Sequence, residues 1–260
     1  MVSTVSSVPL EEVAQANGKG VRWFQLYCVT DREVTASLAE RAAAAGYTAL
    51  VVTVDTPVIG YRPTDLDAGF LPPLHGHGTA NIVEDPVFRA GLAPDADRRA
   101  VLARWAKVFS NPGLTWDDIA WLRHRTQLPI LIKGVLHPDD ARRARELGID
   151  GLVVSNHGGR QVDGAIGALD ALPAVRAAVG DDFTVLFDSG VRTGADVVKA
   201  LALGADAVLY GRPYVYGLGL GGSEGVEHVL RCLLAEFDLA LAACGCTSVR
   251  DLTPEVLVRR

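Results

Sequence analysis

Short apolar segments alternate with helical patterns along most of the chain. Six segments rich in β-branched and aromatic residues end in polar residues or glycine, and five of them lead into a helical pattern. They are VRWFQLYCV (21–29), ALVVTVDT (49–56), PILIKGV (129–135), GLVVSNHGG (151–159), TVLFDSGV (184–191) and AVLYGRP (207–213). Their centres are apolar throughout rather than alternating, which is typical of strands covered on both faces.

The helical patterns carry start and stop signals. They cover residues 31–46, 137–148, 168–180, 193–204 and 223–245. Thr193 and Ser223 are suited to cap helix N-termini, and Gly46, Gly148 and Gly204 are suited to close C-termini.

Alternation of strand and helix predicts a parallel sheet with right-handed crossovers. An open doubly wound sheet and a (β/α) barrel both meet this description. Side chains capable of chemistry stand at nearly every strand end, and a barrel gathers all those ends at one mouth, whereas an open sheet uses one switch point. We therefore predict a barrel.

Only six units of this kind are visible, one of them with a long polar segment after its strand, where a barrel of this type has eight strand–helix units. The stub VSTVSS (2–7) and the helical pattern PLEEVAQANG (9–18) are consistent with the end of one more strand and its helix. The fold class we predict is an α/β, TIM (β/α)8-type barrel that lacks its first strand–helix unit and most of its second strand. Residues 1–260 would form a single domain, with a long, irregular lid or insert at about 62–112 that contains a helical patch at 97–109.

Composition excludes several classes of protein. The chain has 260 residues, of which 49% are hydrophobic, so it has ample apolar surface to fold. A net charge of −6 argues against nucleic acid as the main partner. No apolar run approaches the roughly 18 residues of a membrane span, and the start of the chain has no secretion signal, so we expect a cytoplasmic protein. The four cysteines form no CxxC pair; free thiols are favoured over a metal site at Cys244-Gly-Cys246.

The segment SNHGGRQ (155–161) carries the strongest chemical signal. His157 is a candidate base at a strand end, and Gly158-Gly159 would let a ligand approach the backbone. Arg160 offers a fork that suits a carboxylate. Asp55, at another strand end, could orient the imidazole, although it could also simply cap the turn before Pro57.

Two further strand ends suggest a bound anion or cofactor. Lys133 ends a buried strand, where it could form a Schiff base or offset negative charge on a cofactor. FDSGVRTG and YGRP offer backbone amides, two guanidiniums and a helix start, and they lie where barrels commonly bind phosphate. Ordinary glycine turns are the alternative.

Taken together, FQLY, TVDTP, LIKG, SNHGGRQ, DSGVRTGADVVKALALGADAV and GRP resemble, in order, the successive strand ends of the FMN-dependent L-2-hydroxy acid oxidase and dehydrogenase family. This family includes glycolate oxidase, lactate oxidase and mandelate dehydrogenase. GTANIVEDPVF (78–88) and NPGLTWDDIAWLR (111–123) look most like the lactate 2-monooxygenase branch. Family members begin well before the position of Met1, so the resemblance implies an N-terminally truncated chain.

The resemblance implies a role for each candidate residue. His157 would be the catalytic base, held by Asp55, and Lys133 would stabilise negative charge on the reduced flavin rather than form a Schiff base. Arg160 would bind the substrate carboxylate, helped by Tyr27 and Arg62. The residues implied to bind FMN are Ser3, Gln25, Tyr27, Thr53, Lys133, Ser155, Asp188, Ser189, Gly190, Val191, Arg192, Gly211 and Arg212.

The resemblance therefore implies FMN-dependent oxidation of a lactate-like L-2-hydroxy acid to the 2-oxo acid, and its lactate 2-monooxygenase branch implies oxidative decarboxylation as well. O2 or another acceptor would reoxidise the flavin, and we expect a homo-oligomer with no membrane, nucleic-acid or metal partner. One alternative is a truncated, non-catalytic barrel remnant that needs missing N-terminal residues or a partner to bind FMN. Another is a barrel for a sugar phosphate with Lys133 as a Schiff-base lysine.

Overall fold

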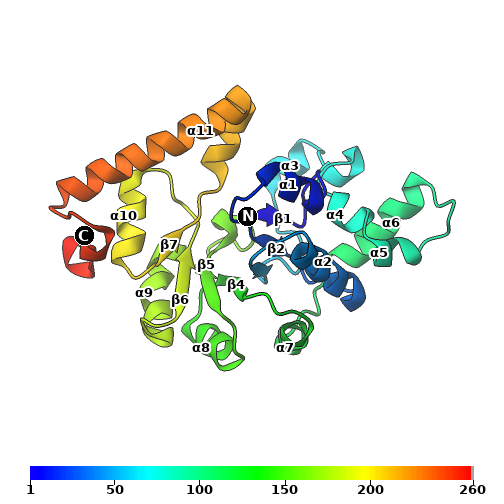
Figure 1. Cartoon of the computed structure of the whole chain (residues 1–260), viewed down its shortest axis with the longest axis horizontal. Helices are drawn as coiled ribbons and strands as arrows, with labels where there is room; N and C mark the ends of the chain where they lie inside the picture. Colours follow the sequence, from blue (N-terminus) through cyan, green and yellow to red (C-terminus); the bar gives the residue numbers. More distant parts are fainter. Residues whose placement is uncertain (259–260) are drawn as a thin grey trace. The chain divides into compact units, whose positions relative to one another are not determined.

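The computed structural model describes residues 1–258, in which parallel strands alternate with helices (Figure 1). The chain divides into two compact units, a first unit from Met1 to Lys133 and a second unit from Gly134 onward. Each unit is described by itself.

The first unit holds the strands that precede and follow the predicted insert. Its elements are β1 (Val2–Ser3), α1 (Leu10–Asn17), β2 (Phe24–Leu26), α2 (Arg32–Ala44), β3 (Leu50–Thr53), α3 (Pro63–Asp67), η1 (Pro72–His75), α4 (Ala80–Val83), α5 (Pro86–Ala90), α6 (Arg98–Phe109), α7 (Trp116–Arg125) and the start of β4 (Ile130–Val135). Strands β1 to β4 pair in chain order, all parallel, with Ser3 opposite Gln25 and Thr53 opposite Lys133. The two-residue β1 confirms that the stub at the start of the chain is a strand.

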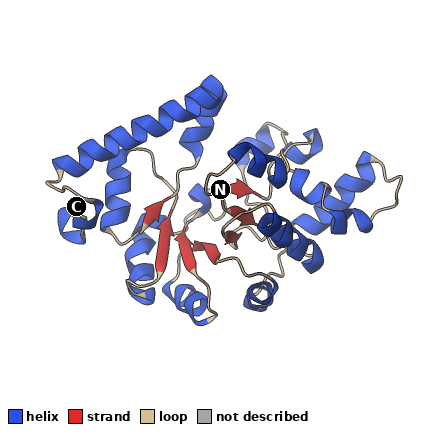
Figure 2. Ribbon diagram, viewed as in Figure 1, coloured by secondary structure: helices blue, strands red, loops and turns tan. Residues whose placement is uncertain are grey.

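The second unit repeats the strand–helix alternation. Its elements are β5 (Gly151–Val154), η2 (His157–Gly159), β6 (Thr184–Phe187), β7 (Ala207–Val208), α8 (Pro138–Glu146), α9 (Ala168–Val179), α10 (Gly194–Ala202), α11 (Arg212–Ala243), η3 (Val249–Asp251) and η4 (Pro254–Val256). Strands β5, β6 and β7 pair in parallel, and Figure 2 shows helices beside them. β5 is buried along its whole length, as its apolar sequence predicts.

These elements confirm the predicted fold class, an α/β chain built from parallel strand–helix pairs. All six predicted strands form within residues 1–258, and β1 adds the stub. The cap prediction holds at Thr193, which begins α10 in a capping box, whereas α11 begins at Arg212 rather than near Ser223. Gly221 and Gly222 leave helical geometry inside α11, so the predicted start coincides with a break in a longer helix.

The segment at 62–112 is more ordered than its sequence suggests. Three short α-helices and one 3₁₀ turn begin at Pro63, Pro72, Ala80 and Pro86, and the predicted helical patch at 97–109 forms the twelve-residue α6, which begins at Arg98. α3 and η1 bury no residue, whereas α4, α5 and α6 bury several. Helices of four or five residues are too short to show a hydrophobic period, which is why the pattern reads as irregular.

Among the described residues, none of the helices has the length and apolar character needed to cross a membrane.

Candidate active site

A row of hydrogen-bonded polar side chains crosses the strand ends of the first unit. Ser3 Oγ donates to Gln25 Oε1 at 2.8 Å, and Gln25 Nε2 donates to Thr53 Oγ1 at 3.0 Å. Gln25 and Thr53 are buried. The row forms because parallel strands bring their carboxyl ends to one edge of a sheet. Three of the residues predicted to contact the flavin ring are thus brought together.

Lys133 continues this row on the next strand. It stands opposite Thr53 in the β3–β4 register, and only 8% of the residue is exposed. Lysine is rarely buried to this degree, because its ammonium loses hydration. A buried lysine at a strand end is suited to a ligand that carries or acquires negative charge.

Tyr27 lies in a second cluster of the first unit, together with Asp55 and Arg62. Burial raises the pKa of the Tyr27 phenol and the Asp55 carboxylate raises it further, against the opposing influence of a Thr56 hydrogen bond and the Arg62 charge. The phenol is therefore protonated at neutral pH and able to donate a hydrogen bond. The Tyr27 ring packs edge-on against Phe109 of α6, with centroids 5.6 Å apart.

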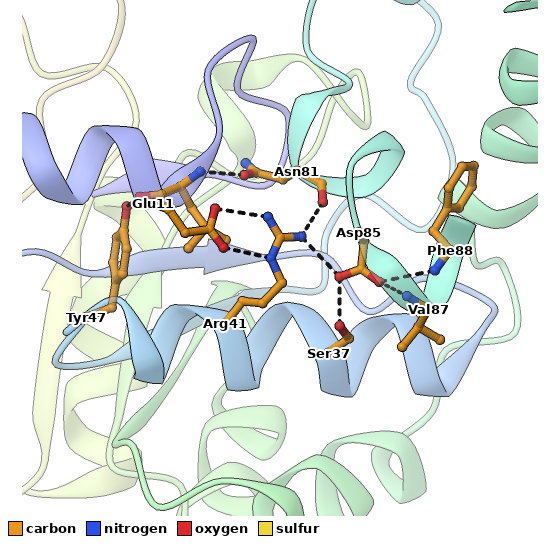
Figure 3. Close-up of polar contacts among 9 residues, drawn as sticks. Glu11, Ser37, Arg41, Tyr47, Asn81, Asp85, Val87 and Phe88 are labelled. Atoms are coloured by element: carbon orange, nitrogen blue, oxygen red, sulfur yellow. Dashed lines mark hydrogen bonds and ion pairs between the residues drawn. The ribbon is translucent and has the colours of Figure 1, made fainter. Parts of the chain in front are cut away.

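A buried network that sequence analysis missed supports the start of the polar row (Figure 3). Asn81 of α4 is fully buried, and its amide nitrogen donates to the carbonyl oxygens of Ser3 at 3.0 Å and Thr4 at 3.3 Å. Its Oδ1 accepts the Leu10 amide at 2.8 Å. One asparagine from the predicted insert therefore joins the end of β1 to the start of α1.

Arg41 of α2 holds α4 and α5 in place within the same network. Its guanidinium donates to the Asn81 carbonyl oxygen at 2.8 Å and to Asp85 Oδ2 at 3.0 Å, and pairs with both oxygens of Glu11. Asp85 is fully buried and also accepts the Ser37 hydroxyl and the first amides of α5. The Asp85-Pro86 pair is a helix-start signal that would have located α5 from sequence.

In the second unit, the segment after β5 forms a tight 3₁₀ turn held by side-chain oxygens. Ser189 Oγ accepts the amides of Asn156 at 3.2 Å and Gly158 at 3.0 Å. Ser155 Oγ accepts the amide of His157 at 3.1 Å, and Asn156 Oδ1 accepts that of Gly159 at 3.1 Å. Four successive amides around the candidate base thus donate to side chains.

Backbone strain is concentrated at this turn. His157 has φ 57° and Ser189 has φ 84°, and they are the two non-glycine residues with positive φ among those the structure describes. Non-glycine residues in such conformations cost free energy, are held there by their surroundings, and cluster at functional sites. The strain supports the assignment of the SNHGGRQ segment to the active site.

The predicted phosphate region lies at the ends of β6 and β7 in the same unit. A Cβ added at Gly190, which has φ 87°, or at Gly211 would meet no atom within 4 Å, so the space next to both glycines is open. The guanidinium of Arg212 donates to the Gly158 carbonyl oxygen at 2.8 Å. The start of α10 does not contribute amides as predicted, because Asp196 accepts those of Arg192 and Thr193 and Glu236 accepts that of Gly194.

The structure thus groups the predicted residues within each unit. The first unit carries Ser3, Gln25, Tyr27, Thr53, Asp55, Arg62 and Lys133, and the second carries Ser155, His157, Arg160, Asp188, Ser189, Gly190, Val191, Arg192, Gly211 and Arg212. The pairing of Asp55 with His157 would join the two units and stays a prediction.

Comparison with known proteins shows the family. The model of the FMN-dependent dehydrogenase family matches residues 1–259. The FMN-dependent alpha-hydroxy acid dehydrogenase qulF of Penicillium citrinum is 51% identical over 99% of this chain and 65% of its own length. An L-lactate oxidase of Lysinibacillus sphaericus is 47% identical over 99% of this chain and 66% of its own length.

A solved structure is similar to this chain in fold. An active chimera of (S)-mandelate dehydrogenase superposes with a TM-score of 0.87 at 39% identity, covering 99% of this chain and 70% of that one. The chain belongs to the FMN-dependent dehydrogenase family. It spans about two thirds of the length of the first relatives named here.

The residues present fit FMN, the cofactor that defines this family. Within the first unit, the Ser3–Gln25–Thr53 row, in which Gln25 and Thr53 are buried, and the buried Lys133 could offer hydrogen bonds and positive charge to a flavin ring. Within the second unit, the open glycines beside Arg192 and Arg212 suit a phosphate, and the assignment of Asp188 to the ribityl chain stays a prediction.

Proposed function

We propose that this protein catalyses the FMN-dependent oxidation of a lactate-like L-2-hydroxy acid to the corresponding 2-oxo acid. The observation that carries the proposal is the strained turn at His157, which holds a base in an otherwise unfavourable backbone conformation with Arg160 three residues further on. Family membership supports the same chemistry, because the relatives include an L-lactate oxidase and an alpha-hydroxy acid dehydrogenase.

The chain's own residues supply binding and proton transfer. Arg160 binds the substrate carboxylate through two parallel N–H bonds, and Arg62 adds positive charge. Tyr27, protonated at neutral pH, donates a further hydrogen bond. His157 accepts the proton that the hydroxy acid loses, while Asp55 orients the imidazole. FMN, when bound, takes up the two electrons, and Lys133 provides the cation that favours their uptake.

Replacing His157 with Gln tests the proposal. The variant should still bind FMN, because glutamine keeps a similar size and no flavin contact is assigned to the imidazole. Flavin reduction should slow by roughly 10²–10⁴-fold, the usual cost of losing an acid–base group. The measurement is anaerobic mixing with L-lactate, glycolate and L-mandelate while flavin absorbance is followed. Reduction at the parent rate would remove His157 from the mechanism.

The same protein preparation can answer two finer questions about the reaction. The segments at 78–88 and 111–123 favour the lactate 2-monooxygenase branch, in which the oxo acid is decarboxylated. Aerobic turnover of L-lactate would then yield acetate and CO2, whereas an oxidase yields pyruvate and hydrogen peroxide. A chain that is a non-catalytic remnant would instead purify without flavin absorbance.

Three broader parts of the proposal come from sequence reasoning. O2 or another acceptor would reoxidise the flavin, the protein would work in the cytoplasm, and it would assemble as a homo-oligomer. Oxygen consumption during turnover checks whether O2 is the acceptor, and light scattering of the purified protein checks the oligomeric state.

A further inference from the structure

We propose that Ser189 is a positioning residue for His157. Its hydroxyl oxygen accepts the amides of Asn156 at 3.2 Å and Gly158 at 3.0 Å, the residues immediately before and after His157. It therefore holds the backbone on both sides of the candidate base from a different strand end. The inference deepens the proposed function and rests on His157 being the base.

The hydrogen-bonding capacity of the Ser189 hydroxyl is fully used in this arrangement. A serine hydroxyl has one donor and two acceptor lone pairs. The proton goes to Asp188 Oδ1 at 2.8 Å, and the two lone pairs receive the two amides. This side chain consequently has no group left for FMN, so any contact of Ser189 with the cofactor would come from its backbone.

The backbone of Ser189 gives a second, independent reason to assign a role to its side chain. Its φ of 84° lies in the region that glycine adopts without penalty and serine adopts at a cost. The neighbouring Gly190 has φ 87° with open space around it, so glycine is structurally acceptable in this turn. A serine at position 189 is thus explained by what its hydroxyl holds rather than by the turn itself.

His157 needs such support because its own φ of 57° is strained. Without the hydroxyl of Ser189, the amides of Asn156 and Gly158 lose their side-chain acceptor, while the Ser155 contact to the His157 amide, the Asn156 contact to the Gly159 amide and the Arg212 contact to the Gly158 carbonyl oxygen are kept. The turn would then relax toward ordinary backbone angles and rotate the imidazole away from its position. Displacements of about 1 Å at a reacting group can cost about 10²-fold in rate.

Two variants separate positioning from general stability. Ser189→Ala removes the hydroxyl and keeps the backbone strain, whereas Ser189→Gly removes both. Ser248→Ala is the matched control: the Ser248 hydroxyl accepts the Arg250 amide at 3.2 Å in another 3₁₀ turn of the same unit. Thermal unfolding should show Ser189→Gly at least as stable as Ser189→Ala.

The first readout needs no activity. In protein labelled at histidine with ¹³C and ¹⁵N, the His157 ring resonances are assigned by their loss in His157→Gln. We expect both Ser189 variants to shift or broaden these resonances, while Ser248→Ala and the other five histidines stay unchanged. Unmoved His157 resonances in both Ser189 variants would overturn the inference.

The second readout is the rate of flavin reduction by a hydroxy acid. Both Ser189 variants should reduce flavin about 10–100-fold more slowly with little loss of FMN affinity, and Ser248→Ala should match the parent. Parent-like rates in both Ser189 variants would overturn the role, as would a loss that follows thermal stability alone. If the parent oxidises no hydroxy acid, the proposed function fails, and the resonances of His157 still decide the positioning role.

Discussion

A substitution at Arg160 can separate the effect of positive charge from the effect of hydrogen-bond geometry at the candidate site. Arg160→Lys keeps the positive charge but cannot form two parallel N–H bonds to a carboxylate. A hydrogen bond to a charged group contributes about 1.5–3 kcal/mol, so KM for the best hydroxy acid should rise roughly 10–100-fold. Steady-state kinetics measure this. Arg231→Lys, on the exposed surface of α11, is the control, and an unchanged KM in Arg160→Lys would exclude the carboxylate contact.

Residue types at strand ends were predictable from sequence because parallel strands gather their carboxyl ends. That reasoning found Lys133 from the pattern, and the resemblance added Ser3, Gln25 and Thr53, which the structure joins by hydrogen bonds. Asn81 could not be found in this way. Its partners Ser3 and Thr4 lie 78 and 77 residues away in the chain, and no local pattern encodes such a contact.

The short helices α4 and α5 act as a support in the first unit rather than as a free cover. Asn81 in α4 and Asp85 at the N-cap of α5 are fully buried and hydrogen-bonded to α1, α2 and the end of β1. By contrast, the apolar side chains before them are exposed, including Tyr61, Leu66 and Phe70. The predicted lid at about 62–112 therefore divides into a largely exposed part at 62–78 and a part from Thr79 to Phe109 that is anchored by buried side chains.

Removing the Asn81 side chain tests this support. Asn81→Ala leaves the buried Leu10 amide without its acceptor and removes one of two donors to the Ser3 carbonyl oxygen, which keeps the Ser6 amide. An unsatisfied buried group costs about 1–3 kcal/mol, so we expect the free energy of unfolding to fall by roughly that amount. FMN affinity should fall with it, because Ser3 is held less firmly. Urea unfolding and flavin titration measure the two effects.

Asn17→Ala is the matched control for Asn81. Asn17 also donates its side-chain amide to a backbone oxygen, that of Gly20, but it is exposed. Its loss should change stability by less than about 0.5 kcal/mol. Equal effects of the two substitutions would show that burial of Asn81 contributes nothing to the support.

The order and type of the strands followed from periodicity, since buried parallel strands are continuous apolar runs bounded by glycine or polar residues. The bounds of the helices were harder to predict from the sequence. α11 runs from Arg212 to Ala243, although Gly217, Gly219, Gly221, Gly222 and Gly225 argue against a continuous helix there. Close packing explains two of these glycines, because a Cβ at Gly217 or Gly225 would collide with the backbone of the other.

The stability of the chain should fall in alkaline solution, and Cys28 provides the clearest cause. Burial raises the pKa of its thiol from the ordinary 9.0 to about 12, with a further contribution from Asp118. A raised pKa means that the folded state keeps a proton that the unfolded state loses. The stability linked to this thiol is therefore complete below about pH 9 and is lost progressively as the pH rises toward about 12.

Cys28→Ala should remove this part of the pH dependence. At its full extent the effect is on the order of 4 kcal/mol, since each pKa unit corresponds to about 1.4 kcal/mol. The variant should be somewhat less stable than the parent at neutral pH, because it loses packing in a buried position, and the difference should shrink or reverse above about pH 10. Urea unfolding across the alkaline range, with the exposed Cys232→Ala as control, measures the slopes. Parallel slopes for the parent and Cys28→Ala would show that the Cys28 thiol is not a source of the alkaline loss.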